Sequence, residues 1–446
     1  MFEHRRVADS ARLARRPTAL TARVLIAALL LVVGACGPSS PSGSPASGSP
    51  VPSASTTANA SGSAQPTPVV DPATVYKTIE DQVVEIRGLH PKTPVNPTIL
   101  DDAGIKKYVA DSFKKDNPAD IVAANERILK AFDLLPPDAS LTDLYINLLG
   151  SQVAGLYSPD DKKLYVVSKS GALGGTEKTT FAHEFTHALQ DQNFDIGKLQ
   201  LDEVGQGDRS LARLSLVEGD AVLTQGTWQI QHLSQAELGD IMASAGNDES
   251  LKVLLAMPPI LRESLLFPYT LGLGFVQGMQ ASGGYDAVNA AFADPPASTE
   301  QILHPDKYFA HEGPVAVTLP KNLAARLGSG WKVGLEDAFG EFQMQVWLKQ
   351  NTTVPAATAI DAAAGWGGDR VAVIDGPNGT WGVLLRTSWD ADRDATEFEK
   401  AAEPIVSKLA APAALLPGAG GRERWIVIGS DRAVLQNLES VLGLAG

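Results

Sequence analysis

The hydrophobic and polar positions divide the chain into an N-terminal part without periodicity and a long periodic part that begins near residue 71. Residues 37–70 are mostly Pro, Ser, Gly, Ala and Thr, and such a segment cannot bury enough apolar surface to fold. Beyond it, apolar residues recur every three or four positions, which is the pattern of helices that bury one face. The stretches expected to be helical are 71–86, 104–115, 118–132, 141–149, 177–192, 209–225, 335–348, 394–409 and 432–442.

Short apolar runs on either side of turn residues predict two β-hairpins and a further strand at 425–428. In the first hairpin, residues 152–157 and 163–168 flank a Ser-Pro-Asp-Asp turn. In the second, residues 371–375 and 381–386 flank Gly-Pro-Asn-Gly. We expect 164–167 to be an edge strand with which an extended peptide pairs. The alternative is a hairpin with a structural role only.

Helices with a few short strands predict an α+β fold in four parts. Residues 1–35 form a signal peptide, and residues 36–70 form a linker. Residues 71–330 form a mainly helical domain with a small antiparallel hairpin. Residues 331–446 form a C-terminal helix and a small α+β unit, to which the sequence assigns no role.

The predicted helix 177–192 contains His183-Glu184-Phe185-Thr186-His187. Positions i and i+4 share one face of a helix, so both imidazoles can bind one Zn²⁺. Glu184, beside the first histidine, lies where it can accept a proton from an attacking water. A catalytic zinc usually has a third protein ligand and one open position. The alternative is a pair of structural histidines that share helical spacing.

Glu218 is the candidate for the third ligand. It stands inside the otherwise apolar helix 209–225, where a carboxylate is costly to bury unless it is paired or bound to metal. The chain between His187 and Glu218 is long enough for a loop and a returning helix. The alternative is an ion pair between Glu218 and a neighbour such as Arg213.

These motifs resemble those of the gluzincin family of zinc metallopeptidases. The segment His183-Glu184-Phe185-Thr186-His187-Ala188-Leu189-Gln190-Asp191 is similar to the metal helix of thermolysin-type peptidases, and Glu218-Gly219-Asp220-Ala221 is similar to the Glu-Gly-x-Ala of the aminopeptidase N family. The resemblance implies a zincin-like catalytic domain over residues 71–330. It also implies one zinc ion per chain, held by the two histidines and Glu218, with Glu184 as the base.

A second resemblance concerns the group that stabilises the oxyanion of peptide hydrolysis. Pro268-Tyr269-Thr270-Leu271-Gly272 is similar to the Pro-Tyr-x-x-Gly of the aminopeptidase N family. This implies that Tyr269 donates a hydrogen bond to the oxyanion; the alternative is a core tyrosine. His304 is the rival donor, since thermolysin-type enzymes use a histidine there. A structural role for His304 remains open.

Ligand histidines usually donate their second N–H to a carboxylate or carbonyl, so an acidic residue near a ligand is a candidate partner. Asp191 lies four residues after His187, on the same predicted helix face. Asp220 lies two residues after Glu218, on another face of its helix. Both are candidates for orienting a ligand.

Charge and the single cysteine bear on partners and location. A net charge of −14 without a basic run argues against nucleic-acid binding. An Arg-rich start, an apolar run at 24–33 and Val33-Gly34-Ala35-Cys36 resemble a bacterial lipoprotein signal. That resemblance implies lipid attachment to Cys36 and a position on the outer face of the cell membrane. The alternative is a secretory signal that happens to contain a cysteine.

The function expected from the sequence is hydrolysis of peptide bonds in a peptide or protein by an exported, membrane-anchored enzyme. Two alternatives remain open. One is an inactive zincin fold that serves as an envelope binding or scaffold lipoprotein. The other is a zinc hydrolase that cleaves a non-peptide amide of the cell wall. The sequence does not address the oligomeric state.

Overall fold

The protein is described by a computed structural model that covers residues 71–167, 173–245, 249–350 and 354–444. The predicted signal peptide, Cys36 and the linker lie outside these residues. The elements in chain order are α1 (Pro72–Arg87), β1 (Pro97–Leu100), α2 (Asp102–Asp116), α3 (Ala119–Ala131), α4 (Leu141–Gln152), β2 (Gly155–Ser158), β3 (Lys163–Val167), α5 (Gly175–Phe194), η1 (Ile196–Leu199), α6 (Gly207–His232), α7 (Gln235–Ala245), α8 (Glu249–Ala256), α9 (Pro259–Ala293), α10 (Thr299–Leu303), α11 (Pro305–Phe309), α12 (Leu323–Leu327), β4 (Lys332–Asp337), α13 (Gly340–Gln350), α14 (Ala356–Ala363), β5 (Trp366–Asp375), η2 (Pro377–Gly379), β6 (Trp381–Trp389), α15 (Asp392–Val406), β7 (Ala413–Pro417), β8 (Glu423–Gly429) and α16 (Arg432–Leu442).

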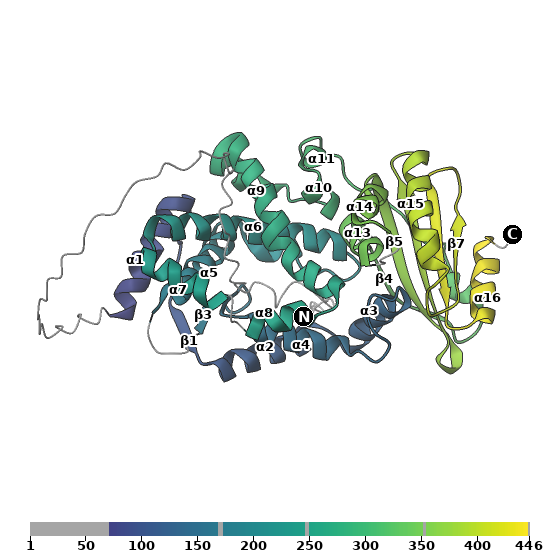
Figure 1. The fold of residues 1–446 in the computed structure, drawn as a ribbon, viewed down its shortest axis with the longest axis horizontal. Helices are drawn as coiled ribbons and strands as arrows, with labels where there is room; N and C mark the ends of the chain where they lie inside the picture. Colours follow the sequence, from purple (N-terminus) through teal and green to yellow (C-terminus); the bar gives the residue numbers. More distant parts are fainter. Residues whose placement is uncertain (1–70, 168–172, 246–248, 351–353, 445–446) are drawn as a thin grey trace, which may run out of the picture.

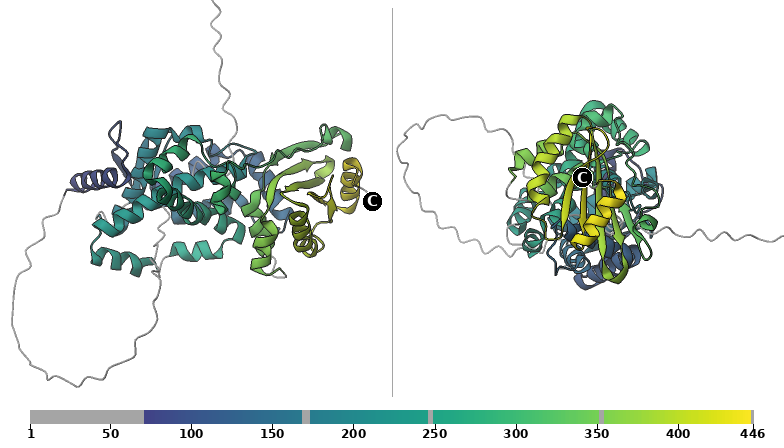
Figure 2. Two further views of the ribbon diagram at one scale, coloured as in Figure 1. Left: turned by 90° about the horizontal axis from the view of Figure 1, so that it is seen from above. Right: turned by 90° about the vertical axis from the view of Figure 1, so that its right-hand side faces the viewer.

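The fold is α+β, as the sequence predicted. A helical part holds a small three-stranded sheet, and a five-stranded antiparallel sheet follows it. The two parts are arranged along the long axis, with α1 and α16 at opposite ends (Figures 1 and 2). No helix among the described residues is both long and apolar enough to cross a membrane.

Helix α5 is the centre of the helical part, because its residues from Thr179 to Asp191 are all buried. It packs against α1, α6, α7 and the strands β2 and β3. The side chain of Glu177 accepts a hydrogen bond from the backbone N–H of Gly174 at 3.1 Å and so caps the first turn. The helix thus begins two residues earlier than the predicted 177. The helix ends at Asp195, which adopts a left-handed conformation.

The small sheet has the strand order β1-β3-β2. Strands β2 and β3 form the predicted antiparallel hairpin, and β1 pairs with β3 in parallel over Pro97–Leu100. Strand β3 is therefore central, and the prediction that 164–167 is a free edge strand is wrong. The sequence lacked a strand signal at β1, which is short and follows a proline-rich loop. Strand β2 is an edge strand of this sheet and packs against α5.

The C-terminal sheet has the order β4-β5-β6-β8-β7, with all pairs antiparallel. Alternate strand residues face opposite sides, so that Val373 and Leu385 join the main core while Ile374 and Leu384 pack with α12 and α16. The stretch 335–348 was predicted to be all helix, but its first three residues belong to β4.

One hydrophobic core runs from the helical part into the C-terminal sheet. The ring of Phe132 in the α3 C-cap lies 5.5 Å from that of Phe339 and 5.3 Å from that of Trp347 in α13. The rings of Phe267 in α9 and Phe342 in α13 are 4.1 Å apart. Residues on both sides of position 331 therefore fold against each other, although the sequence suggested two separate units.

Candidate metal centre

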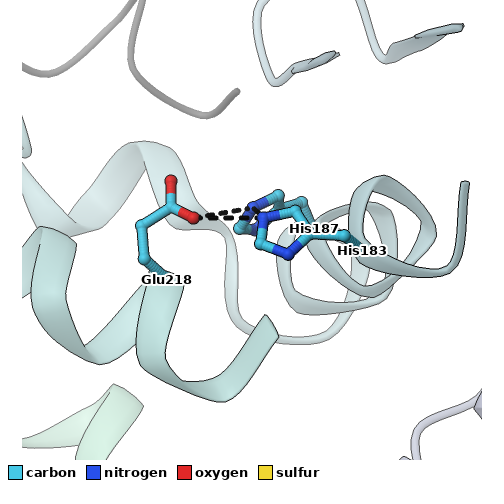
Figure 3. A group of neighbouring side chains, drawn as sticks. All are labelled: His183, His187 and Glu218. Carbon is cyan, nitrogen blue, oxygen red and sulfur yellow. Dashed lines mark hydrogen bonds and ion pairs between the residues drawn. The ribbon is translucent and has the colours of Figure 1, made fainter. Parts of the chain in front are cut away.

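The three predicted ligands meet in space. Nε2 of His183 lies 3.0 Å from Nε2 of His187, and Oε2 of Glu218 lies 3.2 Å and 3.4 Å from these two nitrogens (Figure 3). The histidines come from α5 and the glutamate from α6, which packs beside it. All three side chains are fully buried. The i, i+4 spacing brings the two imidazoles together, and the packing of the two helices adds the carboxylate.

This arrangement fits a zinc ion. Three ligands at about 2.0–2.1 Å from one tetrahedral zinc lie about 3.3 Å from one another, and the observed separations are 3.0–3.4 Å. The other carboxylate oxygen of Glu218 is buried and has no hydrogen-bond partner among the described residues. Two buried imidazoles and a buried carboxylate that converge in this way form a group that could hold a cation. His₂Glu is also a common ligand set of catalytic zinc.

The same contacts move the pKa values of the three side chains. Burial lowers the pKa of His183, and Glu218 only partly opposes this. Burial acts to lower the pKa of His187, but the charge and hydrogen bond of Glu218, the charge of Glu184 and the hydrogen bond with Gln190 together outweigh it and raise the pKa to about 9. Burial acts to raise the pKa of Glu218, yet the histidines lower it below its ordinary value. The carboxylate is thus ionised and ready to bind a cation.

Glu184 is fully buried on α5, next to the first strand residue of β2. A Cβ atom added to Gly155 would lie 3.5 Å from Cγ of Glu184, 2.9 Å from the carbonyl oxygen of Tyr165 and 2.6 Å from Cγ2 of Thr180. Only glycine allows the strand to approach the helix this closely. Strand β2 therefore begins beside the predicted base.

Tyr269 lies beside His183. Its ring is 6.3 Å from that of His183, with an angle of 26° between the ring planes, and its side chain is buried. It belongs to α9, which packs along α6. The structure therefore brings Tyr269, predicted as the oxyanion donor, to the same centre as the three ligands and Glu184.

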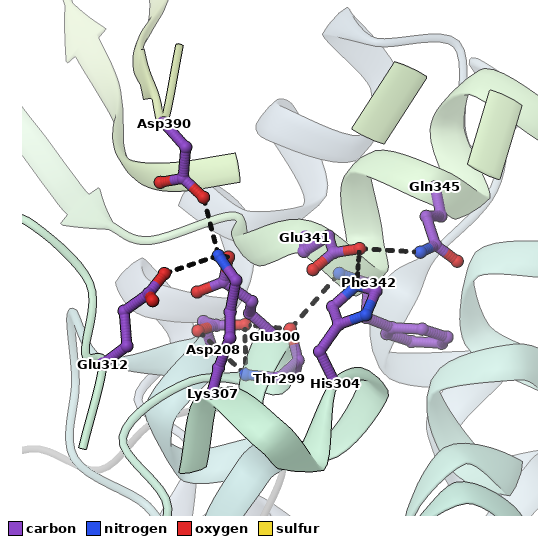
Figure 4. A network of polar contacts seen from close by, with 10 residues as sticks. All are labelled: Asp208, Thr299, Glu300, His304, Lys307, Glu312, Glu341, Phe342, Gln345 and Asp390. Atoms are coloured by element: carbon purple, nitrogen blue, oxygen red, sulfur yellow. Dashed lines mark hydrogen bonds and ion pairs between the residues drawn. The ribbon is translucent and has the colours of Figure 1, made fainter. Parts of the chain in front are cut away.

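Two of the predicted supporting residues lie elsewhere. Asp191 accepts hydrogen bonds from the hydroxyl of Tyr157 and from Nζ of Lys162, both at 2.7 Å, and not from a ligand histidine. Asp191 follows His187 by four residues, but its carboxylate turns toward β2. Nε2 of His304 lies 3.0 Å from Oε1 of Glu341, in the contact between α10 and α13 (Figure 4). The role expected of Asp191 is therefore wrong, whereas the contact with Glu341 agrees with the structural role that the sequence left open for His304.

The partner of His187 is Gln190, which the sequence did not suggest. Its Oε1 lies 2.8 Å from Nδ1 of His187, and its Nε2 donates to the carbonyl of Val217 at 2.9 Å and to Oδ2 of Asp220 at 2.8 Å. Asp220, the other predicted supporting residue, acts one step further from the metal centre. Its Oδ1 accepts a hydrogen bond at 2.7 Å from Nε of Arg87. The position of Gln190, three residues after His187 on the same helix, could have indicated this contact. Nothing in the sequence pointed to Arg87.

Comparisons with known proteins reach only the C-terminal part. Residues 331–435 match a domain family described as a domain of unknown function, DUF8575. This match leaves out the metal centre. The chain matches none of the curated proteins and none of the solved structures.

Proposed function

We propose that the protein is a zinc-dependent peptidase. The observation that carries the proposal is the convergence of His183, His187 and Glu218 within 3.0–3.4 Å of one another. The proposal also draws support from Glu184, which follows the first ligand, and from Tyr269 beside it. The resemblance to gluzincin motifs names the same residues.

Each side chain has a role in peptide hydrolysis. A bound zinc ion supplies a Lewis acid that polarises the scissile carbonyl and makes a water molecule more acidic. Glu184 accepts the proton of the attacking water and passes it to the leaving nitrogen. Tyr269 donates its hydroxyl hydrogen to the oxyanion that develops on the carbonyl oxygen. The buried surroundings strengthen each of these interactions because they exclude water.

The complete burial of the three ligands and Glu184 favours a second candidate function. Structural zinc sites are closed, whereas catalytic sites keep one position open to substrate. A zincin fold that keeps its metal only for stability would serve as a scaffold or binding protein. The presence of Glu184 argues against a scaffold or binding protein, because a structural metal needs no base beside it.

The test compares the parent protein with Glu184→Gln and with Glu85→Gln, which changes an exposed glutamate of α1. Each full-length protein is loaded with zinc and incubated with a complex peptide mixture, and new termini are mapped by mass spectrometry. We expect cuts with the parent and Glu85→Gln that disappear in Glu184→Gln, although all three bind zinc equally. Equal cutting by Glu184→Gln would falsify the mechanism. Zinc binding with no cuts from the parent would favour the scaffold, or a hydrolase of a non-peptide amide.

We also propose that Cys36 carries a lipid that anchors the enzyme on the outer face of the membrane. The support is the sequence around Cys36, with its preceding arginines and apolar run. Mass spectrometry of the membrane-bound protein should show an N-terminal, lipid-modified Cys36. An unmodified Cys36 inside a longer chain would contradict the anchor.

A further inference from the structure

Three buried side chains link the end of α1 to the metal centre. Nε of Arg87 donates to Asp220, Asp220 accepts from Gln190, and Gln190 contacts Nδ1 of His187. The side chains of Arg87 and Asp220 are fully buried. We infer that Asp220 is a positioning residue that fixes the metal-binding tautomer of His187 through Gln190, and that Arg87 fixes Asp220. This inference rests on the proposed zinc site.

The orientation of the Gln190 amide follows from its neighbours. The carbonyl of Val217 and the carboxylate of Asp220 can only accept hydrogen bonds, and both lie within 2.9 Å of one amide end. That end must be the NH₂ group, whose two hydrogens are both used. The oxygen of Gln190 must then face Nδ1 of His187, 2.8 Å away.

The tautomer of His187 follows in turn. An amide oxygen can only accept, so Nδ1 of His187 must carry a hydrogen. The form of His187 that binds a metal is neutral, and with its hydrogen on Nδ1 it has its lone pair on Nε2, the atom that lies 3.4 Å from Glu218 and 3.0 Å from His183. Asp220 therefore fixes the hydrogen on Nδ1 of His187 without contacting His187, because it acts through the amide of Gln190.

Arg87 determines which way Asp220 faces. Its Nε–H occupies Oδ1 at 2.7 Å and leaves Oδ2 for Gln190. The guanidinium carbon lies 4.6 Å from the ring centre of Tyr285 in α9, so the cation has a fixed place between helices. Helix α5 supplies His187 and Gln190, and α6 supplies Asp220 two residues after the ligand Glu218. The proposed ligands, Gln190 and Asp220 thus share α5 and α6, and Arg87 contacts Asp220 from the end of α1.

The isosteric substitution Asp220→Asn provides the test. Arg87 can only donate, so the oxygen of the new amide must keep facing Arg87, and its NH₂ group then faces the NH₂ of Gln190. Gln190 then either keeps its NH₂ on the carbonyl of Val217, against the new NH₂, or turns its amide over, which presents NH₂ to Nδ1 of His187 and its oxygen to that carbonyl. The first arrangement loosens the contact that holds the hydrogen on Nδ1 of His187, and in the second the hydrogen moves to Nε2, where it blocks the metal. We expect zinc to bind 10–100-fold more weakly, on the order of the effect of other outer-shell partners.

A second substitution should restore binding. In the double variant Gln190→Glu, Asp220→Asn, the new carboxylate accepts from both Nδ1 of His187 and the new amide, although it no longer donates to the carbonyl of Val217. The hydrogen on His187 returns to Nδ1, and the total charge of the protein is that of the parent. We expect the double variant to regain part of the zinc affinity that Asp220→Asn loses, the remainder reflecting the lost hydrogen bond to Val217. General damage to the packing would not be repaired in this way.

The measurement is the zinc dissociation constant of the full-length protein, obtained by competition with a chromophoric chelator. The matched control is Asp191→Asn, a buried carboxylate of α5 that bonds Tyr157 and Lys162 instead. It should change zinc affinity by less than about threefold, below the 10–100-fold effect expected of an outer-shell partner. Circular dichroism and thermal unfolding of each metal-free variant show which of them fold.

The outcomes separate this inference from the proposed function. A parent protein that binds no zinc overturns the metal centre itself. A parent that binds zinc, with folded Asp220→Asn as tight as the parent or as little affected as Asp191→Asn, overturns the positioning role alone. A double variant no tighter than Asp220→Asn also overturns it. If Asp220→Asn does not fold, Gln190→Leu takes its place, and unchanged zinc affinity in that variant overturns the role.

Discussion

Gly219 of α6 and Gly272 of α9 face each other where the two helices cross, so closely that neither position has room for a Cβ atom. A Cβ on Gly219 would overlap the backbone of Gly272, and a Cβ on Gly272 would overlap the carbonyl of Ser215. Gly219 directly follows the ligand Glu218, and Gly272 lies three residues after Tyr269. This contact holds the helix of Glu218, the proposed third ligand, against the helix of Tyr269, the proposed oxyanion donor.

Replacing Gly272 by alanine should force α6 and α9 apart. Overpacking of this kind costs about 1–3 kcal/mol, so thermal unfolding should occur at a lower temperature. Zinc affinity and turnover should both fall, because Glu218 and Tyr269 move with their helices. Unfolding curves and zinc titrations measure the two effects.

The control for this substitution is Gly274→Ala on the same helix, where an added Cβ meets nothing within 4 Å. There we expect unchanged zinc affinity and slightly higher stability, since alanine favours helices by about 0.5–1 kcal/mol over glycine. Equal losses in both variants would show that the close crossing is not what matters.

Replacing Tyr269 by phenylalanine should separate binding from catalysis. The ring that stacks on His183 stays, and only the hydroxyl is lost. We expect unchanged zinc affinity and a kcat reduced about 10²–10³-fold, the usual effect of removing one oxyanion donor. Steady-state kinetics on a peptide that the parent cleaves provide the measurement.

His304→Asn tests the rival donor under the same assay. His304 pairs with Glu341, to which Gln345 also donates at 3.0 Å, so its loss should leave kcat within a few fold. A large loss with His304→Asn and none with Tyr269→Phe would reverse the two assignments.

Asp208→Asn should flatten the pH dependence of stability. Burial raises the pKa of Asp208 to about 8, although hydrogen bonds from Thr299 oppose the shift. In the unfolded chain the pKa of an aspartate is about 3.9, so the folded state binds more protons between these values. The free energy of unfolding of the parent should therefore fall as pH rises from about 4 to 8.

The asparagine variant should lose less stability over the upper part of this window, from about pH 6 to 8. A smaller dependence should remain, because burial also raises the pKa of Glu300 to about 7 and those of Asp337 and Asp369 to about 6. Denaturant unfolding at a series of pH values measures the slope, with Asp240→Asn on the exposed side of α7 as control. An identical slope in parent and Asp208→Asn would contradict the assignment.

Lys307 should stabilise the contact between α10 and the C-terminal sheet. Its ammonium lies 2.6 Å from Glu300, 2.8 Å from Glu312 and 2.6 Å from Asp390, so the cation among these carboxylates is the lysine itself (Figure 4). Lys307→Met leaves the buried Glu300 without this partner. We expect a loss on the order of 2–3 kcal/mol, between the values typical of exposed and of buried pairs.

Adding Glu300→Gln to Lys307→Met should recover part of that loss, because it removes the buried charge that lost its partner. Chemical denaturation of the two variants and the parent gives the comparison. No recovery in the double variant would indicate that the methylene stem of Lys307, and not its charge, provides the stability.

Local spacing made part of the metal centre predictable. His183 and His187 had to share a helix face because the helix repeat is 3.6 residues, and Glu184 had to lie next to them. Glu218 was found from a different signal, a carboxylate inside an apolar helix. The α+β class and most helices followed from periodicity in the same way. Each of these features depends on residues that are close in sequence or on the cost of burying a charge.

The errors concern directions and partners that only packing decides. Asp191 has the right spacing from His187, yet its side chain turns to Tyr157 and Lys162 because β2 lies on that side of α5. His304 contacts Glu341 because α13 packs on α10. The hairpin itself was predicted, but β1 pairs with β3 across more than 60 residues of sequence, and no local pattern reveals such a pairing.

By itself, the sequence determined which side chains could bind a metal, because helix geometry and the cost of burying a carboxylate act on neighbouring residues. The tertiary structure decided that His183, His187 and Glu218 meet. It also decided that Arg87 and Asp220 are linked to His187 through Gln190. It did so because α5 packs against α6 and α1 brings its last residue against α6, while Gly219 and Gly272 let α9 approach the same helix closely. Contacts between residues far apart in the chain depend on how helices pack, and helical periodicity shows which face of a helix is buried but not what covers it.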